Sequence, residues 1–216
     1  MAKMKTELEE RQVVCEVRAM PDDERGSVIT GRPIVYDSRT DIGWFDEIIE
    51  RGALDRTDLT DVRFLVNHDV SRIPLARSRR NNGNSTMKLD VDEFGMTINA
   101  VLDTENNADA RALYSAVERG DISGMSFMFG VRGEEWEDLD SEHPTRRITD
   151  ISTVVEVSAV TWPAYDATEI NARSKEALEN ARRAVETARA ERSVEPVETG
   201  ADTKELELLK AKIEIM

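Results

Sequence analysis

The feature that most limits the fold of this chain is a series of short runs rich in β-branched and apolar residues, separated by turn-forming residues. These runs lie at residues 12–19, 27–36, 62–66, 73–78, 87–91, 96–102 and 147–160. The apolar/polar alternation of residues 87–91 and 96–102, on either side of a turn ending in Gly95, predicts a hairpin. The pattern as a whole predicts a mainly β domain.

Other local signals refine this prediction. Residues 107–119 carry an apolar stripe with helical spacing and are followed by Gly120, so we expect a helix that stops at this glycine. Pro33 lies inside a strand-like run and indicates an edge position or a bulge. Residues 44–54 are compatible with either a strand or a helix, although Gly52 limits a helix. Residues 134–141 are rich in acidic residues and are expected to form a loop between two strands. Residues 1–10 are polar and are expected to be a flexible N-terminus.

The composition changes after about Arg173. Residues 174–192 contain no aromatic residue, proline or glycine, and their small apolar side chains recur three or four positions apart. This pattern predicts a helix whose thin apolar stripe buries too little area to fix it firmly to a core. Residues 193–203 resemble a linker, and residues 204–216 predict a second amphipathic helix. We therefore expect a compact domain at 11–172 and a helical, partly disordered tail at 173–216.

Charge and composition exclude several classes of function. The chain has 29 basic and 44 acidic residues, a net charge of −15, which argues against binding to nucleic acid or to a membrane surface. It contains no apolar run long enough to span a membrane and no secretory signal, so we expect it in the cytoplasm. Its single cysteine, Cys15, permits no internal disulfide. The absence of phosphate-binding glycine loops and of metal-ligand spacing predicts no cofactor and no metal.

Three polar residues on separate strand-like segments have the chemistry of a serine hydrolase. Ser126 lies in the apolar segment 124–130, His68 follows the apolar run 62–66, and Glu156 lies between valines. A hydroxyl, an imidazole and a carboxylate are the nucleophile, base and orienting group of such enzymes.

The residues alone are also compatible with structural roles for these groups and with other candidate residues. His68 could be a structural histidine, and Glu156 could pair with an arginine. Ser123 and Ser158 are competing hydroxyls, and His143, in a charged loop, is the other histidine. The Gly-x-Ser-x-Gly elbow of the α/β-hydrolases is missing around Ser126.

The order of these motifs resembles the prohead proteases of HK97-like tailed phages. The resemblance is carried by residues 67–69 with 73–76, by residues 124–129 and by residues 156–165, and residues 31–36 and 51–54 fit the opening region of that family. It runs from about residue 28 to residue 171. One departure is Met128, where the family often has glycine.

The resemblance implies a serine endopeptidase that cleaves the scaffolding part of the phage major capsid protein, and itself, as the prohead matures. It implies Ser126 as the nucleophile, His68 as the general base and Glu156 as the third member; in herpesvirus relatives a second histidine takes that place, for which His143 is the candidate here. The implied fold is α+β but mainly β, an antiparallel β-barrel with surrounding helices, similar to the herpesvirus assemblin proteases. Residues 11–172 would form the serine protease domain.

The same resemblance implies the partners and the location. The partners would be the major capsid protein and its scaffolding segment, together with self-association, and the tail would serve for docking or be removed by autocleavage. The protein would act in the bacterial host cytoplasm, inside the prohead, encoded by a phage or a prophage. The alternative is a non-enzymatic capsid scaffold or assembly protein with a protease-like domain.

Overall fold

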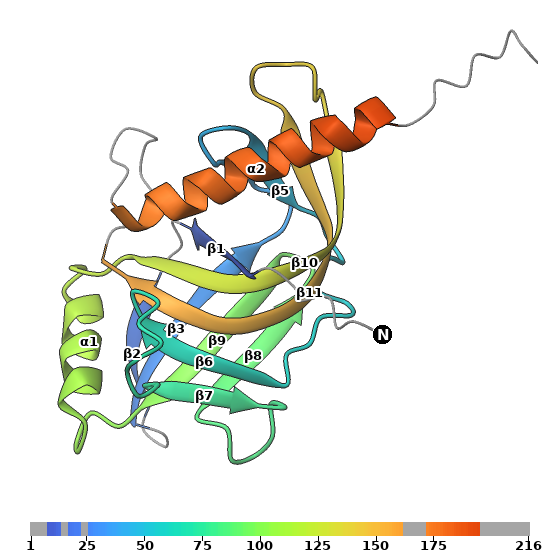
Figure 1. The fold of residues 1–216 in the computed structure, drawn as a ribbon. Coiled ribbons are helices and arrows are strands. Elements are labelled where there is room, and N and C mark those ends of the chain that lie inside the picture. Colours follow the sequence, from blue (N-terminus) through green and yellow to red (C-terminus); the bar gives the residue numbers. More distant parts are fainter. Residues whose placement is uncertain (1–7, 14–16, 23–25, 162–171, 195–216) are drawn as a thin grey trace, which may run out of the picture.

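The structure is a computed structural model and describes residues 8–13, 17–22, 26–161 and 172–194 of the 216-residue chain (Figure 1). Its elements in chain order are β1 (Leu8–Val13), β2 (Arg18–Asp22), β3 (Gly26–Val35), β4 (Arg39–Asp41), β5 (Asp46–Ile49), β6 (Asp61–Val66), β7 (Ala76–Arg79), β8 (Met87–Asp92), β9 (Gly95–Leu102), α1 (Ala108–Glu118), β10 (Gly124–Glu137), β11 (Thr145–Val160) and α2 (Ala172–Val194).

The strands form two sheets. The larger sheet has the order β1-β10-β11-β5-β4, and β6 joins it by pairing with β11 while β7 pairs with β6. The smaller sheet is antiparallel, with the order β2-β3-β9-β8. Side chains from both sheets meet in one hydrophobic core, in which Ile29 and Ile98 of the small sheet join Phe127 and Val157 of the large one. The sheets therefore pack face to face, each burying its apolar side.

The long hairpin of β10 and β11 forms the centre of the large sheet. Its register shifts at four places between Met128 and Glu134, and such bulges bend a strand and increase its twist. Both strands accordingly sweep across the molecule as a curve (Figure 1). Their first pairs, from Gly124 with Val160 to Met128 with Glu156, keep a regular antiparallel register. This regular part carries Ser126.

The expectation of an antiparallel barrel is only partly met. The described strands are mainly antiparallel, as expected, but no pairing among them closes a barrel. The reason lies in β11, whose second edge is taken in parallel by β5 along residues 145–148 and by β6 along residues 156–159. The large sheet therefore branches at β11 instead of curling into one ring. The likeness to the herpesvirus assemblin fold stays a prediction.

Of the two described helices, α1 lies at the left of the molecule beside β2, and α2 runs across its top (Figure 1). In α1, Asn107 is the N-cap and its side chain accepts hydrogen bonds from the N–H groups of Asp109 and Ala110, while Gly120 follows the end of the helix with a φ of 78°. The buried residues of α1 are Ala110, Leu113 and Val117, so the predicted apolar stripe does face the core. None of the described helices is long and apolar enough to cross a membrane.

The helix predicted at 174–192 is present as α2, but it is attached more firmly than its thin stripe suggested. Ala181 and Val185 are buried against Phe45 in a second, smaller hydrophobic cluster. Arg189 donates hydrogen bonds to the carbonyl oxygens of Leu139 (2.9 Å) and Ser141 (2.8 Å). The helix predicted at 204–216 and the linker before it lie outside the described residues, and the division into domains stays a prediction.

Most predicted strands are present, with informative differences. The hairpin at 87–102 and the bulge at Pro33, where the β3–β9 register shifts between Gly31 and Ile34, are confirmed. The prediction of one strand at 12–19 was wrong, because the chain there contributes to β1 in the large sheet and to β2 in the small one. Residues 134–137, predicted as part of an acidic loop, continue β10 because they pair with β11.

Gly95 gives a test of the packing between β9 and β3. It has a φ of 135°, and an added Cβ would lie 2.0 Å from the carbonyl oxygen of Ile34. We expect Gly95→Ala to lower the free energy of unfolding by at least about 2 kcal/mol, since backbone strain and overpacking each cost about 1–3 kcal/mol. Urea denaturation measures the loss.

Gly120→Ala is the matched control for this variant. Gly120 also has a positive φ, but nothing lies within 4 Å of the position of an added Cβ. Only the backbone strain of about 1–2 kcal/mol should appear. An equal loss in both variants would contradict the close approach of Gly95 to β3.

Candidate active site

The structure brings Ser126, His68 and Glu156 together from three neighbouring strands. Ser126 lies in β10, Glu156 in β11, and His68 directly after β6, which pairs with the other edge of β11. Nε2 of His68 lies 2.5 Å from Oγ of Ser126, and Nδ1 of His68 is hydrogen-bonded to Oε1 of Glu156. The three side chains thus form one continuous hydrogen-bonded chain, although up to 88 residues separate its members in the sequence.

A tight turn aims the imidazole. Asn67 and His68 both have positive φ, 50° and 57°, and the N–H of Asp69 donates to the carbonyl of Val66 over 3.1 Å. Positive φ at both central positions is the mark of a type I′ turn, which reverses the chain within two residues. Left-handed backbone is uncommon for histidine and is held by its surroundings. Here Oδ1 of Asn67 accepts hydrogen bonds from the N–H and hydroxyl of Thr161.

Glu156 is a buried carboxylate, 2% exposed, whose partners hold it in place. Besides His68 it accepts a hydrogen bond from the hydroxyl of Ser158 at 2.6 Å, and Oγ of Ser158 in turn accepts one from the backbone N–H of His68 at 3.1 Å. Ser158 therefore fixes the carboxylate and the histidine turn relative to each other. In the described part of the chain, the partners of Glu156 are this serine and the imidazole rather than an arginine.

Ser126 is completely buried, because β1 lies beside it. In the antiparallel pairing of β1 with β10, Gln12 is opposite Ser126, and the Ser126 hydroxyl lies 2.8 Å from the carbonyl oxygen of Arg11. A hydroxyl has one proton to donate. With β1 seated, the carbonyl of Arg11 and Nε2 of His68 compete for it.

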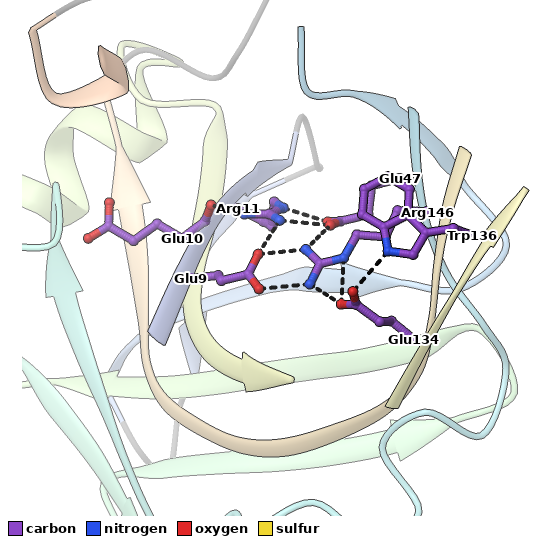
Figure 2. A network of polar contacts seen from close by, with 7 residues as sticks. All are labelled: Glu9, Glu10, Arg11, Glu47, Glu134, Trp136 and Arg146. Atoms are coloured by element: carbon purple, nitrogen blue, oxygen red, sulfur yellow. Dashed lines mark hydrogen bonds and ion pairs between the residues drawn. The ribbon is translucent and has the colours of Figure 1, made fainter. Parts of the chain in front are cut away.

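Ion pairs around the buried side chains of Arg11, Glu47 and Arg146 hold β1 in place (Figure 2). The network consists of Glu9, Arg11, Glu47, Glu134 and Arg146. Arg11 donates to both carboxylate oxygens of Glu47, at 2.5 and 2.7 Å, and Arg146 donates to both oxygens of Glu9, at 2.7 and 2.9 Å. Buried charges are tolerated only when paired in this way, so β1 is docked by complementary charge.

The pairing outweighs the cost of burial for the charges of β1. Burial alone raises the pKa of the Glu9 carboxyl, but hydrogen bonds from Arg146 and the charge of Arg11 lower it to about 2. Burial likewise disfavours the charged guanidinium of Arg11, and the carboxylates of Glu47 and Glu9 nevertheless raise its pKa. Both groups are therefore ionised at neutral pH.

His143 belongs to a different part of the molecule. Its Nε2 lies 3.2 Å from a carboxylate oxygen of Asp46 and 3.8 Å from one of Asp41, and these three groups are near enough to one another to hold a metal ion. Asp46 is already paired with Arg39 at 2.6 Å. Because His143 contacts these two acids, His68 is the histidine that lies at Ser126.

Sequence reasoning picked out the three residues of the chain of hydrogen bonds but gave Ser158 only the part of a competing hydroxyl. The signal for its true position was present: Glu156 and Ser158 are two apart on a strand, so their side chains share a face. Arg11 and Glu47 were missed. Nothing local marks them, because each charge is explained only by the other, 36 residues away.

The buried serine, bonded through histidine to a carboxylate, is the side-chain arrangement of the serine hydrolases. The model of the caudovirus prohead serine protease family matches residues 15–183, so the chain belongs to that family. It is a serine protease of phage capsid maturation. No curated protein matches.

Among solved structures, that of the bacteriophage T4 capsid assembly protease, gp21, is similar to this chain at 13% sequence identity. The alignment covers 71% of this chain and 99% of the T4 chain, with a TM-score of 0.38.

Ser158→Ala should disturb both the fold and the site. It removes the donor to Glu156 and the acceptor for the His68 N–H, and leaving buried groups unsatisfied costs about 1–3 kcal/mol. We expect kcat for peptide cleavage to fall by about 10- to 100-fold, since misplaced catalytic groups cost that much, with KM little changed.

Ser152→Ala is the control on the same strand. The Ser152 hydroxyl is buried and finds no hydrogen-bond partner among the described residues, so its removal should change neither kcat nor stability. Thermal unfolding and steady-state kinetics on both variants make the comparison. A Ser158→Ala enzyme with wild-type kcat would exclude the positioning role.

Acid should weaken the seating of β1. The pKa of Glu9 falls from 4.5 to about 2 on folding. Because the folded value is the lower one, the stability that Glu9 contributes is fully present above pH 4.5 and is lost as the pH falls toward about 2. We expect the free energy of unfolding to decrease over that range, and Glu9→Gln to remove this part of the decrease.

Urea titrations at a series of pH values measure the effect. Glu10→Gln is the control, because its side chain points away from the network in Figure 2. Identical pH profiles for wild type and Glu9→Gln would contradict the role of the Glu9–Arg146 pair.

Proposed function

We propose that this protein is the endopeptidase that cleaves the scaffolding part of the major capsid protein, and itself, during prohead maturation, with Ser126 as the nucleophile, His68 as the general base and Glu156 as the orienting residue. The observation that carries the assignment of roles is the continuous chain from Ser126 through His68 to Glu156. Its order of groups matches the order that proton transfer requires.

The chemistry follows from the atoms in contact. His68 takes the proton of the Ser126 hydroxyl through Nε2 as Oγ attacks a peptide carbonyl carbon, and later gives that proton to the leaving amine. Glu156 accepts a hydrogen bond from Nδ1, so it fixes the tautomer that leaves Nε2 free to act as a base. The buried carboxylate then stabilises the imidazolium that forms. Water completes the cycle by hydrolysing the acyl-enzyme ester.

The proposal extends to partners, location and fold. The protein would act inside the prohead in the bacterial host cytoplasm, encoded by a phage or a prophage, and would self-associate there. Residues 11–172 would form the protease domain, and the tail, 173–216, would dock on scaffold or capsid protein and be cut away. We expect the sheet that carries the site to superpose on that of the herpesvirus assemblin proteases. A non-enzymatic scaffold would leave the chain of hydrogen bonds at Ser126 without a role.

The test is intact-mass spectrometry of the full chain co-expressed with the capsid precursor. We expect defined cuts in the capsid protein and in the tail, and none with Ser126→Ala or His68→Ala, because loss of either group lowers the rate by roughly 10⁴-fold or more. Glu156→Gln should cost less, about 10²- to 10⁴-fold.

Ser123→Ala is the matched control, since Ser123 is exposed and lies immediately before β10. It should cut at the wild-type rate. Circular dichroism must show that the three site variants fold. Full cleavage by folded Ser126→Ala would remove it as the nucleophile, and a wild-type rate in Glu156→Gln would remove Glu156 as the orienting residue.

A further inference from the structure

We propose that the edge of β10 beside Ser126 is the cleft that binds the substrate chain, that β1 occupies this cleft as a substrate-like strand, and that Glu47 selects a lysine or arginine at the residue whose carbonyl is attacked. The inference rests on the proposed role of Ser126 as the nucleophile. It deepens that role by naming the substrate chemistry and the segment that blocks the site.

The backbone of β1 lies where a substrate would lie. β1 pairs antiparallel with β10 from Leu8 opposite Gly130 to Val13 opposite Met125, and its other edge pairs with no described strand. Extended peptides bind proteases and other receptors by adding a strand to such an edge. The carbonyl oxygen beside Ser126 Oγ is that of Arg11, 2.8 Å away. The Arg11–Gln12 peptide bond therefore stands in the place of a bond to be cut.

The side chain of Arg11 fills a pocket built for a cation. It is only 9% exposed, donates to both oxygens of Glu47, and lies 5.5 Å from the centre of the Phe129 ring. Glu47 itself is 3% exposed. If β1 leaves, the cation that remains in contact with Glu47 within the described part of the chain is Arg146, at 3.1 Å, and Arg146 also serves Glu134. Without Arg11, the buried carboxylate of Glu47 would be only partly neutralised. It therefore favours binding of another basic side chain in the position of Arg11.

A second subsite follows from the same strand. Glu9 is two residues before Arg11, so both side chains point to the same face of β1. Arg146 binds both oxygens of Glu9, whereas the side chain of Glu10, on the other face, points away from the network (Figure 2). With β1 absent, Arg146 is available for an acidic residue two positions before the basic residue. The preferred substrate sequence is acidic–any–basic, cleaved after the basic residue.

The pocket has room for either basic residue. A cavity of about 20 Å³ remains beside Arg11, and its lining includes Glu47, Thr40 and Ser38. This volume suits one water molecule, to which Ser38, Thr40 and Glu47 offer polar groups between the apolar side chains of Val35, Ile49 and Phe127. A lysine ammonium in place of the guanidinium could therefore reach Glu47 with such a water completing its hydrogen bonds.

The position of β1 makes it a built-in inhibitor. Ser126, His68, Glu156, Glu47 and Arg146 all lie inside the matched family region, residues 15–183, whereas β1 lies before it. While β1 is in place, the Ser126 hydroxyl donates a hydrogen bond to the carbonyl oxygen of Arg11, and Ser126 is completely buried. Substrate must displace β1 before Ser126 can attack.

The experiment measures cleavage of fluorogenic peptides of sequence Glu-Ala-X by the full chain, with X as arginine, lysine, alanine or glutamate. We expect arginine and lysine to exceed alanine and glutamate by at least about 30-fold in kcat/KM, the usual cost of unpairing a buried charge. Glu47→Gln should erase this preference, mainly through KM. Glu50→Gln, which changes a partly exposed carboxylate paired with Arg147 just after β5, is the control and should keep it.

The blocking role has its own variant. Arg11→Ala should raise the rate at subsaturating substrate by about 10-fold, because β1 loses its bonds to Glu47 while the cleft stays intact. Adding the peptide of residues 8–13 in trans should again slow cleavage of the fluorogenic peptide, because it competes for the cleft whether or not it is cut itself, and the same peptide with Arg11→Ala should not. Glu10→Gln should behave as wild type.

The outcomes separate this inference from the proposed function. Cuts that persist in Ser126→Ala would overturn the proposed function itself. Cuts that need Ser126 but show no preference for basic residues, with Arg11→Ala as slow as wild type, would overturn only the substrate cleft. Should Glu47→Gln fail to fold, mass-spectrometric mapping of the bonds that the wild-type protein cuts in the capsid precursor decides the question. Cuts after lysine or arginine support the pocket, and cuts elsewhere refute it.

Discussion

The site depends on β11 being paired along both edges over the same few residues. Residues 156–159 bond to β10 on one side and in parallel to β6 on the other. This places Ser126 and the turn that carries His68 on opposite flanks of Glu156, within reach of one carboxylate. All three strands pack in the common core, so the sheet holds the hydrogen-bonded side chains in fixed positions. The site therefore needs no flexible loop to assemble it.

Charge pairing is the second interaction on which the site depends. The chain has a strong acidic excess, yet it buries Arg11 and Arg146 beside the site, each between carboxylates. A strand held by such pairs differs from one held by apolar packing, because desolvation cancels much of what the pairs contribute. β1 is therefore well suited to be exchanged for another chain with the same charges. In the proposed cleft, the pairs that hold β1 in the resting protein are the pairs that would bind a substrate.

Local patterns predicted the local structure well. The β8–β9 hairpin and α1 are correct because alternation, a turn glycine and a helix cap act within a few residues. The errors arise where distant parts decide. Residues 12–19 contribute to two strands in different sheets, and residues 134–137 extend β10 although they are acidic, because Glu134 pairs with Arg146 across the hairpin. Similarly, α2 is attached through Phe45, which no helical pattern could indicate.

For the site, the sequence by itself determined the chemistry: one hydroxyl in an apolar strand, one imidazole at a strand end and one carboxylate between valines, in an order that resembles a known family. Only the tertiary structure decided that these groups touch, that Ser158 joins two of them, and that Arg11 lies on Ser126 with its charge against Glu47. The physical reason is that a period of two residues says which face of a strand a side chain occupies but not which strand lies beside it. Neighbours are chosen by burial and charge pairing across the whole fold.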